Sequence, residues 1–159
     1  MDDEKNALTH FLTAQRASVL AIVDGLDPVA LTTSVLPSGW TPLGLIDHLA
    51  HAERHWFQDV LLGWSEPPLY PDECTPLRTT RSPAEVFAFY RAACDRSDAV
   101  LAETPLSARP RGHHPDPLGA EITDLRRVVL HVIEETARHA GHLDAARELL
   151  DGRTGLGPR

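Results

Sequence analysis

Hydrophobic positions recur every three to four residues in four long segments of the chain, the spacing that places side chains on one face of an α-helix. Between these segments we find no convincing run typical of a β-strand. The pattern therefore predicts an all-α protein. The predicted helices cover approximately residues 3–25, 41–62, 82–103 and 124–152.

Local signals indicate where these helices begin and end. Thr41-Pro42 places a capping hydroxyl before a proline, and this pair suits the first turn of a helix. Ser82-Pro83-Ala84-Glu85 has the pattern of a capping box, in which the serine and glutamate side chains bind backbone amides at the helix start. Glycine follows three of the four helices, as is typical of helix ends, at positions 25, 63 and 152.

Three connectors separate the predicted helices. Residues 26–40 leave room for one helical turn after Asp27-Pro28, whereas residues 64–81 and 104–122 are long and lack periodicity. An eighteen-residue connector such as 64–81 reaches about 60 Å when extended, and a twenty-residue helix is only about 30 Å long. Such a connector can cross a bundle and leave neighbouring helices parallel. We therefore predict a four-helix bundle with long crossover loops.

Composition and charge narrow the class of protein. The chain has 159 residues, 42% of them hydrophobic, which suits a single domain over residues 1–159 and excludes a disordered chain. The net charge is −8 without a basic stripe, so we expect no nucleic-acid partner. The sequence has no apolar run of about 18 residues and no signal-peptide pattern, so we expect no membrane partner and a cytoplasmic location. Two cysteines, Cys74 and Cys94, are too few for a disulfide framework.

The chain contains nine histidines, and the last predicted helix carries three of them beside a glutamate. His131, His139 and His142 all fall within about 40° of Glu135 around the helix axis. Glu135 and His139 are four residues apart, so both side chains can converge on one divalent ion. The competing interpretation is a polar helix face in solvent. His142 suits a place beside the ligands or on the surface, and His131 could be structural.

The second predicted helix contributes His48, His51 and His55. His48 and His55 share a face but lie about 10 Å apart along the axis, too far to bind one ion. His48 has hydrophobic neighbours and would ordinarily be a core residue, but the pair on the last helix lacks a third donor. We therefore predict His48, Glu135 and His139 as metal ligands, with His51 and His55 at the rim of the site or on the surface.

Two imidazoles and one carboxylate leave at least one position open on a zinc-like ion, as in catalytic sites. That position can hold water or a thiol, and the metal lowers the pKa of either. Mixed nitrogen and oxygen ligands admit zinc, nickel, iron or manganese. His113 and His114 lie in a loop rich in proline and arginine, where we expect them to be solvated, although the loop could fold over the site.

Two motifs resemble those of the DinB-like metal-binding bundles. The first comprises Gly39-Trp40-Thr41-Pro42, Asp47-His48-Leu49-Ala50-His51 and Trp56-Phe57. The second, residues 131–144, is similar to the last helix of an actinobacterial branch of that superfamily. The resemblance extends from the first helix to residue 152 and implies a four-helix bundle with crossover connections. It also implies that a divalent ion is held by one residue of the second helix and two of the last, here His48, Glu135 and His139.

Many members of the superfamily have histidine where this chain has Glu135. In this departure the chain resembles the mycothiol-dependent maleylpyruvate isomerases, whose zinc is held by two histidines and a glutamate. The resemblance implies a homodimeric thiol-S-transferase that uses zinc and a small thiol such as mycothiol on an electrophilic small molecule, without implying the isomerase substrate. In this hypothesis His142 or His51 transfers protons. The alternatives are a non-catalytic metal-binding bundle of stress response and a helical dimer with solvated histidines.

Overall fold

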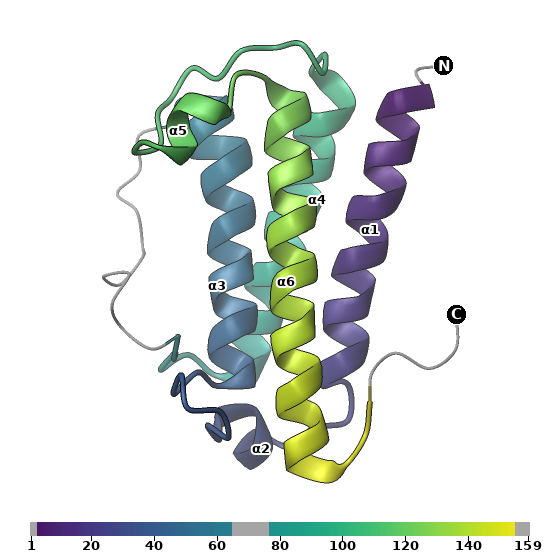
Figure 1. Ribbon diagram of the computed structural model, residues 1–159, viewed down its shortest axis with the longest axis vertical. Helices are drawn as coiled ribbons and strands as arrows, with labels where there is room; N and C mark the ends of the chain where they lie inside the picture. Colours follow the sequence, from purple (N-terminus) through teal and green to yellow (C-terminus); the bar gives the residue numbers. More distant parts are fainter. Residues whose placement is uncertain (1–2, 65–76, 155–159) are drawn as a thin grey trace.

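The computed structural model describes residues 3–64 and 77–154, and four long helical segments lie side by side in it (Figure 1). This arrangement confirms the predicted all-α bundle, and no strand occurs within the described ranges. The long segments are α1 (Asp3–Val23), α3 (Pro42–Arg54) with its continuation η1 (His55–Leu61), α4 (Pro83–Glu103) and α6 (Leu125–Asp151). The short helices are α2 (Pro28–Thr32), which confirms the turn expected there, and α5 (Leu118–Glu121).

The direction of the helices shows why one connector must be long. Helices α1 and α6 run one way and α3 and α4 run the other, and α1 packs along α6 as α3 packs along α4 (Figure 1). The packed pairs are therefore parallel. Leu77 lies back at the start of α3, where its carbonyl accepts a hydrogen bond of 3.1 Å from the Thr41 amide. The other long connector, residues 104–124, stays at one end of the bundle (Figure 1).

The helix ends agree with the signals in the sequence. The Thr41 hydroxyl accepts a hydrogen bond from the Gly44 amide at 3.1 Å, and the capping box of Ser82 and Glu85 is formed. Gly152 ends α6 with a φ of +77°, a conformation that side chains other than glycine rarely adopt. These caps set where α3 and α4 begin and where α6 ends.

The second long helix changes its winding near its end. Its last seven residues, η1, form a π-helix, which the hydrophobic pattern did not distinguish from an α-helix. The connector that precedes α6 attaches to its final turn, because the Arg111 amide donates to the Leu61 carbonyl at 3.0 Å and the Gly112 amide to that of Val60 at 2.8 Å. The connector is thereby held against the end of this helix.

Within the described residues, the buried hydrophobic side chains form two clusters, one toward each end of the bundle. Several hydrophobic side chains of the second long helical segment are buried in these clusters, among them Leu45, Leu49 and Trp56. None of the described helices is both long and apolar enough to cross a membrane.

Candidate metal centre

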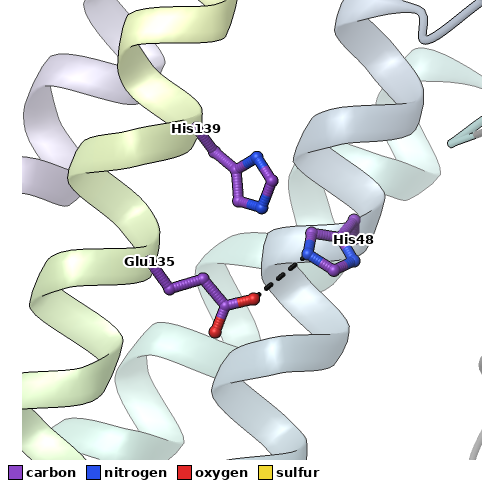
Figure 2. A group of neighbouring side chains, drawn as sticks. All are labelled: His48, Glu135 and His139. Atoms are coloured by element: carbon purple, nitrogen blue, oxygen red, sulfur yellow. Dashed lines mark hydrogen bonds and ion pairs between the residues drawn. The ribbon is translucent and has the colours of Figure 1, made fainter. Parts of the chain in front are cut away.

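His48, Glu135 and His139 lie together between α3 and α6 (Figure 2). The four-residue spacing places Glu135 and His139 on one face of α6, and antiparallel packing brings His48 of α3 opposite them. The His48 Nε2 atom is 3.1 Å from the Glu135 Oε1 atom, and the rings of His48 and His139 are 4.8 Å apart between centroids. One potential ligand atom from each of the three residues lies within 4.8 Å of the others. The residues predicted as ligands therefore meet in the folded chain.

Burial and hydrogen bonding set the charge of these groups. Burial alone would raise the pKa of Glu135, but the imidazoles of His131 and His48, at 3.3 and 3.1 Å from its two oxygens, outweigh it and hold the pKa well below the usual range. His139 is only 8% exposed, and its burial, assisted by the nearby His48, lowers its pKa to about 4. At neutral pH Glu135 is therefore ionised and His139 is neutral, the states in which both bind a metal.

The spacing of the trio fits a divalent cation. Ligand atoms in a tetrahedral zinc site are about 3.3 Å from one another, because each lies roughly 2.0–2.2 Å from the ion. The distance of 3.1 Å between His48 Nε2 and Glu135 Oε1 already agrees with this separation. The potential ligand atoms of the three residues all lie within 4.8 Å of one another. Small side-chain movements would therefore bring the remaining pairs to the separation found in a zinc site. Two imidazoles and a carboxylate are also a donor set that suits zinc and related ions.

His142 lies beside the trio. Its ring is 5.8 Å from the His139 ring and 4.9 Å from the indole of Trp40, which also contacts His139 at 5.5 Å. The side chain is half-buried, and its Nδ1 atom has no hydrogen-bond partner within residues 3–64 and 77–154. This position is the one expected for a residue beside the ligands.

His51 faces another helix. Its ring packs against Phe89 of α4 at 4.9 Å, and its Nε2 atom is 4.0 Å from the carboxylate of Asp47. Burial lowers the pKa of His51, although Asp47 opposes the shift. His51 thus faces α4, whereas His142 belongs to α6.

A second group of aromatic side chains extends from the trio toward the end of the bundle. His131 places its Nε2 atom 3.3 Å from Glu135 Oε2, and its ring is 4.4 Å from that of Trp56. On Trp56 lies the half-buried ring of His114, at 4.6 Å, so the connector does fold over this end of the helix. His113 is exposed, as expected. The contact of His131 with Glu135 follows from their four-residue spacing, whereas no signal in the sequence indicated where His114 would lie.

The fold and the trio together define a helical bundle with a candidate metal centre between two facing helices. The chain belongs to the mycothiol-S-transferase family, whose sequence profile matches residues 7–152. This membership confirms the resemblance to the DinB-like bundles, and it places the chain in a family of transferases.

A solved structure supports the fold. The crystal structure of a conserved protein from Enterococcus faecalis superimposes with a TM-score of 0.66 over 93% of this chain and 97% of that one. The two sequences are 13% identical, so this similarity concerns the fold alone. Among curated proteins no sequence matches the chain significantly.

Proposed function

We propose that this protein is a metal-dependent thiol-S-transferase that joins a low-molecular-weight thiol such as mycothiol to an electrophilic small molecule. His48, Glu135 and His139 hold the ion, which we expect to be zinc rather than nickel, iron or manganese. One observation carries the proposal: these three donors converge from facing helices in a chain of the mycothiol-S-transferase family.

The three ligands leave room for a thiol on the ion. When bound, a zinc-type ion lowers the pKa of a coordinated thiol, so that the thiolate is available at neutral pH. Glu135 supplies the one negative charge of the ligand set. His131 orients this carboxylate by contacting its second oxygen at 3.3 Å, the kind of support that metal-binding carboxylates commonly receive.

His142 is the group best placed to accept the proton of the thiol. It neighbours His139, and its buried Nδ1 atom has no hydrogen-bond partner in the part of the chain that the structure describes. The sulfur electron pair then forms a bond to the electrophilic carbon, and the group that leaves this carbon takes the electrons of the broken bond. His142 returns its proton to that leaving group. His51 is the second candidate for this role, although its ring faces Phe89.

Metal content and thiol transfer test the proposal together. Purified protein should contain one zinc-type ion per chain, and Glu135→Gln should weaken binding at least about tenfold because the only anionic ligand is lost. Glu134→Gln is the matched control, since Glu134 is the exposed neighbour of Glu135. The rate of thiol consumption should be measured with a panel of electrophiles for the normal protein and both variants. We expect the rate to be lower in a protein that contains less metal.

Two results would contradict the proposal. Equal metal binding by Glu135→Gln and Glu134→Gln would show that the trio is not the metal site. Normal metal binding without acceleration by any thiol would instead favour a non-catalytic metal-binding bundle.

A further inference from the structure

Two further imidazoles meet outside the trio. His55 begins η1 and His114 lies in the connector between α4 and α6, yet His55 Nε2 and His114 Nδ1 are only 2.9 Å apart. Both side chains are half-buried. Two ring nitrogens at this distance form a hydrogen bond when one of them carries a proton. Their separation is also close to that between two neighbouring ligand atoms of one cation.

A carboxylate stands behind this pair. Asp59 Oδ2 lies 3.5 Å from the other ring nitrogen of His55, Nδ1, one helical turn away. A carboxylate in this position orients an imidazole and makes its opposite nitrogen a stronger metal ligand. The second oxygen of Asp59, Oδ1, is buried and has no hydrogen-bond partner within the described ranges. The negative charge of the Asp59 carboxylate, which no hydrogen bond to Oδ1 offsets there, favours a cation at the two imidazoles.

The backbone around His114 is shaped to hold this residue in place. A side chain at position 112 would put its Cβ atom 2.0 Å from the Asp59 carbonyl oxygen, and one at position 119 would put it 1.8 Å from that of His114. Only glycine fits at either position. His55 and Asp59 both lie in the π-helix η1. Such an irregularity within a helix is frequent at functional sites. The two imidazoles are thus positioned before any ligand binds.

We propose that His55 and His114, with Asp59 behind His55, bind a second divalent cation of the class that prefers imidazole, such as zinc or copper. This site is separate from the trio, because His55 follows His48 by seven residues and lies about 10 Å further along the helix. With two protein ligands instead of three, it binds its ion more weakly than the trio does. The inference does not depend on the proposed transferase activity.

Zinc titration of the untagged, metal-free, full-length protein tests this site. Equilibrium dialysis should show two zinc ions per chain, the second bound more weakly than the first. His114→Ala should abolish the weaker binding and retain the tighter, and Asp59→Asn should weaken the second ion by about tenfold or more. His113→Ala is the matched control, because His113 is the exposed residue next to His114.

A second variant tests whether His114→Ala abolishes the weaker binding only because the connector loosens. His55→Gln removes the other imidazole from the helix side and must also abolish the weaker binding. The proposal is overturned if the normal protein binds one zinc only, or if His114→Ala and His113→Ala bind zinc alike. His139→Ala removes the tighter ion alone, so failure of this site and failure of the trio give different results.

Discussion

At the level of single residues, the burial of His139 makes the stability of the folded protein sensitive to acid. Its imidazole is 8% exposed, and burial lowers its pKa from 6.5 to about 4. Between these two values the unfolded chain binds a proton that the folded protein does not. The free energy of unfolding therefore falls as the pH drops through this window and is insensitive to this group above it.

We predict that the metal-free protein loses up to about 3 kcal/mol of stability through His139 between pH 6.5 and pH 4, since each pKa unit corresponds to roughly 1.4 kcal/mol. Urea denaturation across this range measures the loss. His139→Gln, which does not titrate here, should flatten the dependence, whereas His113→Gln at an exposed position should leave it unchanged. The same pH slope in His139→Gln as in the normal protein would show that burial of this imidazole is not the cause.

The site residues differ in how far the sequence could predict them. Glu135 and His139 share a helix face by their spacing alone, so that pair was predictable. His48 was chosen because that pair lacked a third donor, and the resemblance to known bundles supported the choice, since spacing alone does not show which helices face each other. His114 had no such signal, because its position depends on backbone hydrogen bonds between the connector and η1.

At the level of elements, Gly44 shows how closely the chain packs where α3 begins. A Cβ atom at this position would lie 2.1 Å from the Leu77 carbonyl oxygen, a backbone atom that also accepts a hydrogen bond from Thr41. Glycine is therefore required in α3 by the backbone of Leu77 and Arg78, which lies against the start of this helix. This requirement was not visible in the helix pattern, which treats glycine as a weak helix former.

We predict that Gly44→Ala destabilises the protein by about 1–3 kcal/mol, the usual cost of forcing extra atoms into packed structure. Gly141→Ala is the control, because in the described part of the chain no atom beyond the adjoining helix backbone lies within 4 Å of a Cβ at this exposed position of α6. That substitution should be neutral or raise stability by up to about 1 kcal/mol through its helix propensity. Thermal unfolding measures the stability of both variants. An equal change in stability in the two would mean that the Leu77 backbone moves aside at no cost.

At the level of the whole molecule, the fold class followed from the helix pattern, but the arrangement of the helices did not. The caps of α3 and α4 were readable because a threonine or serine precedes a proline at each start. Connector length allowed parallel neighbours without showing which connector spans the bundle. The described residues on either side of 65–76 lie at opposite ends of the bundle, whereas residues 104–124 stay at one end and form backbone hydrogen bonds with η1.

A buried ion pair joins three of the long helices between the two hydrophobic clusters. Arg16 of α1 donates two hydrogen bonds, of 2.7 and 2.8 Å, to the carboxylate of Glu53 in α3 and a third, of 2.6 Å, to Asp98 of α4. Arg16 is 6% and Glu53 1% exposed. A buried charge of this kind is tolerated only with its partner, so each residue depends on the other.

We predict that Arg16→Met lowers the free energy of unfolding by about 3–5 kcal/mol at neutral pH, because Glu53 is left as an uncompensated buried charge. Arg126→Met should cost no more than about 1 kcal/mol, since its ion pair with Glu4 is solvent-exposed. Combining Arg16→Met with Glu53→Leu should recover much of the loss, as both charges are then replaced by hydrophobic groups. Urea denaturation of the three variants separates these effects. If Arg16→Met costs no more than Arg126→Met, then water or a local rearrangement solvates Glu53, and the buried ion pair does not determine the stability of the bundle.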